Sequence, residues 1–302
     1  MLTGATVLAT AAQAAGGAPP AGDRAVALAA PLPRGQVIAR SLPGDPEFRF
    51  HLYVPAGTAA PTRLFVTVHG ISRNAREHAR RYAALAERYG VVLVAPEFPP
   101  ERFPDYQRLG RADRGDRADL VLNRLIDAVA LATGARGDKV WLFGYSGGGQ
   151  FAHRYAMAYP ERVAGYVVGA AGWYTFPDST LRFPRGTRGR RDLADVRFDA
   201  QRFLAVPGAV VVGERDVHAG TALRKTGKVD AQQGETRFER GERWVAAMNE
   251  AAAARGLPPH YVFHELSRSP HSFRKSMRRG DMGGWVFERL FGPAPAELAG
   301  AG

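Results

Sequence analysis

Short apolar runs alternate with longer amphipathic segments along most of this chain. The short runs predict buried strands, and the segments with apolar residues at helical spacing predict helices. We expect strands at Arg63–Val68, Val91–Ala95, Lys139–Tyr145, Val163–Val168, Ala209–Val212 and Tyr261–Leu266. We expect helices at Asn74–Tyr89, Asp116–Thr133, Gly147–Tyr159, Gly234–Arg255 and Asp281–Phe291. This alternation is typical of βαβ crossovers, so we predict an α/β fold with a mostly parallel sheet and helices on both faces.

Two earlier segments follow a strand pattern of a different kind. Gly35–Ser41 and Phe48–Val54 alternate apolar and polar residues around a turn at Pro43–Pro46. This predicts a hairpin that forms an antiparallel N-terminal edge of the sheet. A later insert, Trp173–Pro207, is rich in Arg, Asp, Phe and Pro and is too short for an independent domain. We therefore expect a single domain over residues 34–295, with the insert as a cap or wall over a site.

The leading segment, residues 1–33, consists mainly of Ala, Gly and Pro. Such a composition cannot bury enough apolar surface to fold. The small residues Ala12–Ala14 resemble a signal-peptide cleavage site, although the positive region that precedes one is missing. Two interpretations stay open, a disordered tail and a remnant signal peptide. We favour periplasmic or secreted localisation over cytoplasmic.

Composition narrows the class of protein further. The chain has 302 residues, with 41 Lys+Arg against 29 Asp+Glu and a net charge of +12. It contains no cysteine, which excludes disulfides, a thiolate nucleophile, thiolate-bound zinc and iron–sulfur clusters. No run approaches about 18 consecutive apolar residues, so we expect no membrane span. The positive charge comes without a recognised nucleic-acid motif, and we expect no nucleic-acid partner.

The basic residues gather in two clusters, and both could attract an anion. The first cluster lies in the insert and the second near the C-terminus. The first contains Arg182, Arg185, Arg188, Arg190 and Arg191, and the second contains Arg274, Lys275, Arg278 and Arg279. One interpretation is a solvated arginine-rich surface. The other is selection of an anionic substrate by the insert, beside the predicted site.

The segment Gly144-Tyr145-Ser146-Gly147-Gly148 fits the Gly-x-Ser-x-Gly nucleophile elbow. An apolar strand precedes it and a helical pattern follows it, which is the context that this motif requires. The glycines leave room for a sharp strand-to-helix turn, and the turn holds Ser146 in a strained conformation above the sheet edge. We expect Ser146 to be a catalytic nucleophile.

A serine nucleophile needs a base and a carboxylate that orients the base. In this sheet architecture the partners follow the serine in the order acid, then histidine, each after a later strand. Asp216 follows the strand at 209–212 and is the expected acid; Glu214 is a competitor that lies too close to the strand. His271 follows the last strand and is the expected base.

Other residues at the same predicted sheet edge could bind the substrate. His69-Gly70 ends an early strand where this fold places its first oxyanion donor. We expect the backbone N–H groups of Ile71 and Gly147 to form the oxyanion hole. The expected contacts with substrate are His69, Tyr145, Trp173 and Tyr174. The chain shows no His pair or carboxylate cluster at metal-ligand spacing, so we expect neither a metal nor a cofactor.

These pieces resemble the α/β-hydrolases, and more narrowly the esterases around the polyhydroxybutyrate depolymerases and feruloyl esterases. The matching segments are Phe50–Pro55, Leu64–Gly70, Asp119–Ile126, Asp138–Gln150, and the turns at Asp216 and Pro270-His271. The resemblance implies a serine esterase that acts on a small ester substrate. Polymer-degrading members often carry cysteines beside the oxyanion residues and a substrate-binding domain, and this chain departs from them in both respects.

Two alternatives belong to other functional classes. The run Gly144–Gly149 is also similar to the elbow of prolyl-oligopeptidase-like serine peptidases. Those enzymes carry a large propeller, which the residues before the first strand are too few to form. A basic, non-catalytic binding protein on a hydrolase scaffold is the second alternative. The complete Ser-Asp-His order argues against a binding protein, because binding alone does not need all three residues.

Overall fold

The computed structural model describes residues 28, 31–111, 113–217, 223 and 225–294. Its centre is an eight-stranded sheet with the strand order β1-β2-β4-β3-β5-β6-β7-β8. The strands are β1 (Val37–Leu42), β2 (Asp45–Tyr53), β3 (Arg63–Val68), β4 (Val91–Pro96), β5 (Val140–Tyr145), β6 (Val163–Gly169), β7 (Gly208–Gly213) and β8 (Val262–Leu266). Strands β3 to β8 run parallel, whereas β1 pairs antiparallel with β2 and β2 antiparallel with β4. The predicted α/β fold with its antiparallel edge hairpin is confirmed.

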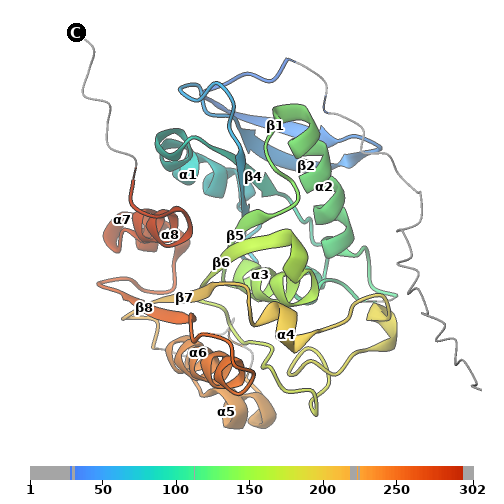
Figure 1. Ribbon diagram of the computed structural model, residues 1–302, viewed down its shortest axis with the longest axis vertical. Coiled ribbons are helices and arrows are strands. Elements are labelled where there is room, and N and C mark those ends of the chain that lie inside the picture. Colours follow the sequence, from blue (N-terminus) through green and yellow to red (C-terminus); the bar gives the residue numbers. More distant parts are fainter. Residues whose placement is uncertain (1–27, 29–30, 112, 218–222, 224, 295–302) are drawn as a thin grey trace, which may run out of the picture.

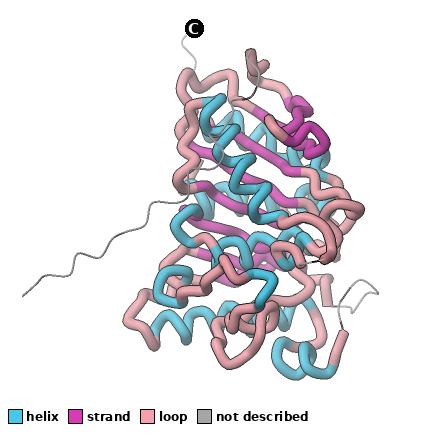
Figure 2. The backbone as a smooth tube through the Cα atoms, turned by 90° about the vertical axis from the view of Figure 1, so that its right-hand side faces the viewer, coloured by secondary structure: helices cyan, strands magenta, loops and turns pink. Residues whose placement is uncertain are grey.

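Helices cover both faces of the sheet (Figure 1). One face carries α1 (Ala75–Tyr89), α7 (Phe273–Arg279) and α8 (Met282–Phe291). The other carries α2 (Ala118–Thr133), α3 (Gly147–Ala158) and α6 (Arg237–Ala253), together with the short helices α4 (Ala200–Phe203) and α5 (Gly227–Gln233). Figure 2 shows the strands one below another, with helices in front of them. Each face therefore has its own apolar core, and the central strands β3 to β7 are buried on both sides.

The parallel strands deliver the predicted site residues to one edge of the sheet. His69 and Gly70 follow β3, Ser146 follows β5, Asp216 lies shortly after β7, and His271 lies after β8. The carboxyl ends of parallel strands meet at the same edge, which is where ligands bind in open α/β sheets. His69 and His271 are 202 positions apart in the sequence, and the parallel strands bring both to this edge.

Three helices were not predicted, namely α4, α5 and α7. Each is short, and α5 and α7 are mostly polar or charged, so the apolar periodicity that marks a helix is weak. Tertiary contacts hold them instead, because isolated helices of this length are unstable in water. Most of the predicted leading segment lies outside the described residues, although Leu28 is buried against the core. Among the described helices, none has the length and apolar character needed to cross a bilayer.

The insert at 173–207 does not cover the strand edge beside Ser146. Its apolar side chains, among them Phe183, Leu193 and Phe203, are buried in the core on the α3 face. None of its residues lines the cleft at Ser146. The insert therefore packs as part of the domain, and the expectation of a cap or wall over this cleft is wrong.

Candidate active site

Ser146 occupies a strained turn between β5 and α3. Its backbone angles are φ 54° and ψ −112°, a region that residues other than glycine rarely adopt. A Cβ at position 144 would fall on the carbonyl oxygen of Gly148, and a Cβ at 148 would fall on the carbonyl oxygen of Val68. The close approach of these backbones requires glycine at both positions. The turn is held by a hydrogen bond of 2.7 Å from the Ser146 N–H to the Gly169 carbonyl.

Three side chains from separate loops form a continuous hydrogen-bonded chain. Nε2 of His271 lies 3.2 Å from Oγ of Ser146, and Nδ1 of His271 lies 2.7 Å from Oδ2 of Asp216. The Asp216 side chain is 1% exposed, whereas that of His271 is 27% exposed. With the proton on Nδ1, the imidazole donates to the carboxylate and its Nε2 can accept the serine proton. This arrangement can activate a hydroxyl for attack on a carbonyl.

Asp216 has a second partner that the sequence did not reveal. Nη1 of Arg237, in the first turn of α6, lies 3.2 Å from Oδ1 of Asp216. The Arg237 side chain is 3% exposed, so this ion pair is buried together with its carboxylate. Asp216 is therefore shared between a guanidinium and an imidazole. No motif marks Arg237, because its role depends only on where α6 packs.

The competing acid, Glu214, points elsewhere. Its Oε1 accepts a hydrogen bond of 2.5 Å from the backbone N–H of Arg268, and it lies 3.4 Å from the guanidinium of Arg215. Glu214 thus ties the loop after β7 to the loop after β8. This contact joins the two loops that carry Asp216 and His271.

A cleft of about 390 Å³ opens over Ser146. It is lined by Gly70–Ser72, Tyr145–Ser146 and His271–Arg274, together with Asn74 and Glu77. A Cβ at Gly70 would lie 3.4 Å from the Cβ of Ser146, and a Cβ at Gly147 would lie 3.1 Å from the Ile71 side chain. The loop after β3 and the start of α3 thus come together beside the serine. The N–H of Gly147, at the first position of α3, has no acceptor within its helix.

His69 does not line this cleft, and its expected contact with substrate is wrong. The ring is fully buried, with Nε2 accepting a hydrogen bond of 3.0 Å from the Phe98 N–H and Nδ1 2.8 Å from the Gly70 carbonyl oxygen. Burial lowers the pKa of His69 to about 4, so the ring is neutral and donates from Nδ1. Tyr106 donates to the His69 carbonyl oxygen at 3.0 Å. His69 therefore fixes the backbone next to Ile71.

Arg73 supports the same loop and was not identified from the sequence. Its guanidinium donates to the Phe98 carbonyl oxygen and lies 4.3 Å from the centroid of the Tyr106 ring. Arg73 has a positive φ of 54°, so the loop turns sharply just beyond the expected oxyanion donor. A cation over an aromatic face is attracted by the ring quadrupole. The loop that carries Ile71 is thus held from both sides.

Tyr145 lines the cleft beside the serine. Its ring stacks on that of His271 with centroids 5.5 Å apart, and its hydroxyl contacts Ser276. Burial raises the pKa of Tyr145, so the phenol is neutral. Its position beside His271 fits both a wall of the cleft and a support for the imidazole.

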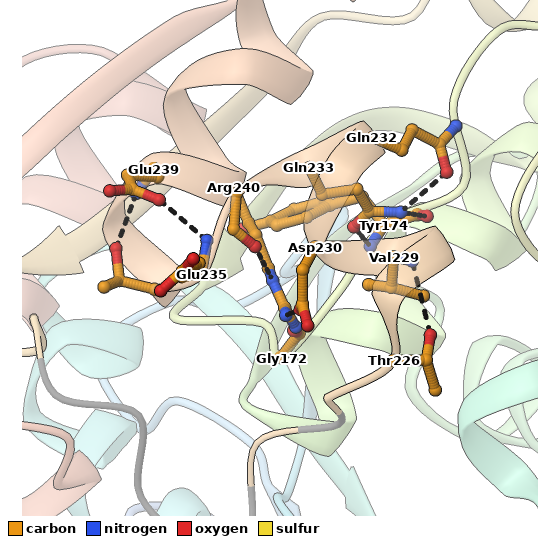
Figure 3. A network of polar contacts seen from close by, with 12 residues as sticks. Gly172, Tyr174, Thr226, Val229, Asp230, Gln232, Gln233, Glu235, Glu239 and Arg240 are labelled. Carbon is orange, nitrogen blue, oxygen red and sulfur yellow. Dashed lines mark hydrogen bonds and ion pairs between the residues drawn. The ribbon is translucent and has the colours of Figure 1, made fainter.

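Tyr174 is a core residue, so its expected contact with substrate is wrong (Figure 3). Gln233 bonds both backbone groups of Tyr174, accepting from its N–H at 2.8 Å and donating to its carbonyl at 2.9 Å. The ring stacks on Trp244 with centroids 5.1 Å apart. In the same network, the buried Arg240 joins the Gly172 carbonyl oxygen to Asp230. The start of the insert is therefore locked onto α5 and α6, which turns the Tyr174 ring inward.

Trp173 lies in a different hollow from the serine. This hollow, of about 720 Å³, is also lined by Arg108, Phe183, Lys228 and other residues of the insert and α5. The guanidinium of Arg154 lies 4.6 Å from the centroid of a Trp173 ring. Trp173 does not line the cleft at Ser146, and its expected contact with substrate stays a prediction.

The two basic clusters have different relations to the cleft. The arginines of the insert line hollows that do not include Ser146 or His271. The second cluster lies on α7, which begins two residues after His271, and Arg274 lines the cleft itself. In the part of the chain that the structure describes, no group of three or more His, Asp or Glu side chains could hold a metal ion.

Residues 48–255 match the model of the family described as esterase PHB depolymerase. The chain belongs to this esterase family. Its members are α/β-hydrolases that cleave carboxylic esters, and this chain is a carboxylic ester hydrolase of that kind. A comparison with curated proteins finds no relative that matches.

Solved structures of esterases and depolymerases are similar to this member of the family. LpqC, a poly(3-hydroxybutyrate) depolymerase from Bordetella parapertussis, is 27% identical, with 83% of this chain and 86% of that chain covered and a TM-score of 0.67. Poly(aspartic acid) hydrolase-1 from Sphingomonas sp. KT-1 is 25% identical, with coverages of 74% and 88% and a TM-score of 0.64. An S-formylglutathione hydrolase from Agrobacterium tumefaciens shares the fold. It is 19% identical, with 80% of this chain and 90% of that chain covered and a TM-score of 0.52.

Proposed function

We propose that this esterase cleaves its substrate through an acyl-enzyme formed on Ser146, with His271 as the general base and Asp216 as the acid that orients it. The observation that carries the proposal is the unbroken chain of contacts, 3.2 Å from serine to imidazole and 2.7 Å from imidazole to carboxylate. It ends on a serine held at a positive φ at the start of a helix.

The reaction follows from this geometry in two halves. Ser146 Oγ attacks the ester carbonyl carbon while its proton passes to Nε2 of His271. The tetrahedral oxyanion accepts hydrogen bonds from the N–H groups of Ile71 and Gly147, and the N-terminus of α3 favours its negative charge. His271 then protonates the leaving alcohol, and the C–O bond breaks. Water, deprotonated by His271, attacks the acyl-enzyme and releases the carboxylic acid and Ser146.

Asp216 acts through His271 in both halves. Its carboxylate accepts from Nδ1–H, which keeps Nε2 free to take the serine proton. When the imidazole becomes positive, the buried carboxylate stabilises it more strongly than water would, because the local dielectric is low. The support of the Asp216 loop by Glu214, and of the Ile71 loop by His69 and Arg73, keeps these groups in place before substrate arrives.

The substrate class that we propose is a small ester. A cleft of about 390 Å³ is at the lower end of ligand sites in proteins. Of the two similar structures, LpqC is named for the ester polymer poly(3-hydroxybutyrate). Membership of the esterase family favours esters over the peptides of a prolyl-oligopeptidase-like enzyme, and the Ser146–His271–Asp216 contacts favour an enzyme over a binding protein.

The test is Ser146→Ala, with Ser179→Ala as the matched control because Ser179 is exposed in the insert. Hydrolysis of p-nitrophenyl acetate by Ser146→Ala should fall by about 10⁴-fold or more, and labelling by a fluorophosphonate should disappear. Ser179→Ala should retain both. An active Ser146→Ala protein would overturn the mechanism. Cleavage of a matching p-nitroanilide faster than the ester would favour the peptidase.

A further inference from the structure

The helix α7 carries four positive charges on one side. Arg274 and Arg278 are one turn apart, as are Lys275 and Arg279, so the four side chains form two adjacent rows. All four are exposed, whereas Phe273 and Ser276 on the opposite side are buried. We call the four cations the α7 basic face. Helix α7 lies beside α8 on the α1 side of the sheet (Figure 1).

The α7 basic face lies next to the cleft at Ser146. It lines a hollow of about 490 Å³, together with Ser272. Ser272 and Arg274 line both this hollow and the cleft, so the two are neighbours that share a wall. A charged group on a substrate held at Ser146 would therefore need to reach only past Ser272 and Arg274 to meet the α7 basic face.

The charges on this face are only partly balanced. Arg274 lies 3.5 Å from Glu77, which also pairs with Arg81 at 2.8 Å. No carboxylate among the described residues pairs with Lys275, Arg278 or Arg279. Beyond the Arg274–Glu77 contact, the hollow is therefore lined by three cations that have no anionic partner among the residues that the structure describes.

Helix stability does not account for this arrangement. Arg278 and Arg279 in the last turn complement the helix dipole, but Arg274 and Lys275 lie in the first turn, where positive charge is unfavourable. Like charges one turn apart also repel each other. Both of these costs fall when an anion binds between the rows, which points to a ligand rather than to the fold.

Contacts on the buried side of α7 fix the helix against the rest of the domain. Phe273 stacks on His78 with ring centroids 3.7 Å apart, and Ser276 is buried against Tyr145. Ser272 caps the helix by accepting from the Lys275 N–H at 3.4 Å. The α7 basic face is thus fixed relative to His271 by contacts on its buried side.

We propose that the α7 basic face binds a carboxylate on the alcohol part of the ester, and so selects substrates with an anionic leaving group. The direction follows from the reaction: His271 donates its proton to the leaving oxygen, and Ser272 and Arg274, one and three residues after His271, line the cleft on the same side. The alcohol part therefore departs along the wall that leads to α7. The inference rests on the proposed function of Ser146 and His271 and adds the substrate class to it.

The experiment compares two esters that differ in one charge, 4-acetoxybenzoate and methyl 4-acetoxybenzoate. The measured quantity is the ratio of their kcat/KM values, normalised to wild type so that differences in chemical reactivity cancel. The test protein is the triple variant Lys275→Gln/Arg278→Gln/Arg279→Gln. The matched control is Arg182→Gln/Arg188→Gln/Arg191→Gln, which removes the same charge from exposed positions in the insert.

The normalised ratio should fall about tenfold in the α7 variant at low salt, because three charge contacts of ordinary strength are lost. The ratio should stay within about twofold of wild type in the insert control. In about 0.5 M NaCl the wild-type preference for the charged ester should weaken, because the screening length becomes shorter. Arg278→Lys/Arg279→Lys keeps the charges and should keep the ratio, which separates lost charge from a disturbed helix. If the triple α7 variant does not fold, product inhibition of wild type by 4-hydroxybenzoate, weakened by salt and by Lys275→Gln alone, serves instead.

An equal fall in both triple variants would overturn the proposal, because the effect would then come from net charge. An unchanged ratio in a folded α7 variant, or a fall in the insert control alone, would also overturn it. Hydrolysis of the neutral ester reports on the proposed function separately: if wild type cleaves it and Ser146→Ala does not, the triad stands even when the ratio refutes the anion site.

Discussion

Arg237→Met tests whether the buried guanidinium beside Asp216 affects catalysis by His271. The substitution keeps most of the side-chain volume and removes the charge that lies 3.2 Å from the carboxylate. The two side chains are 3% and 1% exposed, so water screens this pair very little. Removing one partner of a buried ion pair destabilises proteins by about 3 to 5 kcal/mol. Because Asp216 keeps its bond to His271, we expect about 3 kcal/mol.

The same change alters how the Asp216 carboxylate is held during catalysis. Arg237 lies 3.2 Å from one carboxylate oxygen, and His271 lies 2.7 Å from the other. Without Arg237 the carboxylate can rotate, so it holds the imidazole less firmly in the orientation that activates Ser146. We expect kcat/KM to fall about tenfold, which corresponds to about 1.4 kcal/mol of transition-state stabilisation.

The assay is kcat/KM for p-nitrophenyl acetate at pH 7.5, together with urea unfolding. Arg243→Met on the exposed side of α6 is the matched control and should change neither quantity. Arg237→Lys keeps a positive charge beside Asp216, so it should retain more activity than Arg237→Met. A folded Arg237→Met protein with wild-type kcat/KM would refute this reasoning, whatever its stability.

Two further predictions concern stability. Gly144→Ala should prevent the elbow from forming, because the new methyl group would fall on the Gly148 carbonyl. In Gly189→Ala the new methyl group meets nothing within 4 Å, so the free energy of unfolding measured by urea titration should stay within about 0.5 kcal/mol of wild type. Burial holds the pKa of three histidines below the ordinary value of 6.5, and unfolding lets them bind protons, so acid should destabilise the fold. These are His69, with a pKa of about 4, His78 and His153. The free energy of unfolding should drop by about 4 kcal/mol from pH 7.5 to 5.5; equal urea midpoints at the two pH values would contradict this.

The features that could be predicted from the sequence are those that depend on short local patterns, such as apolar runs and the glycine motif. The apolar runs identify all six parallel strands. Five of them, β3 to β7, are almost wholly buried, so their apolar signal is continuous, whereas the edge strand β8 is only partly buried. The elbow motif can also be found from the sequence, because its glycines are adjacent. Gly144 is needed for a contact within the elbow itself, whereas Gly148 is needed because the backbone of Val68, at the end of β3, lies against it. Parallel strands then bring the residues after β5, β7 and β8 to one edge.

The features that could not be predicted depend on which way a side chain turns. Trp173 and Tyr174 follow a strand at the right edge, but Gln233, far along the chain, binds the backbone of Tyr174 and directs its ring to Trp244. His69 likewise ends its strand beside the site and turns into the core toward Phe98. Position at the sheet edge is therefore a weaker guide to substrate contact than it is to the triad, whose members must also bond to one another.

The buried Arg237 places a positive charge beside Asp216, and the α7 basic face places positive charges beyond Ser272. The effects of these two groups of cations can be separated. Arg237 acts through Asp216, so its loss lowers kcat/KM for charged and neutral esters alike. The α7 charges lie in solvent beyond Ser272, so they act only on a substrate that carries charge, and salt weakens them. A variant that lowers kcat/KM for both esters but leaves their ratio unchanged, and a second that changes the ratio alone, would show that activation of the triad and selectivity are set by different cations.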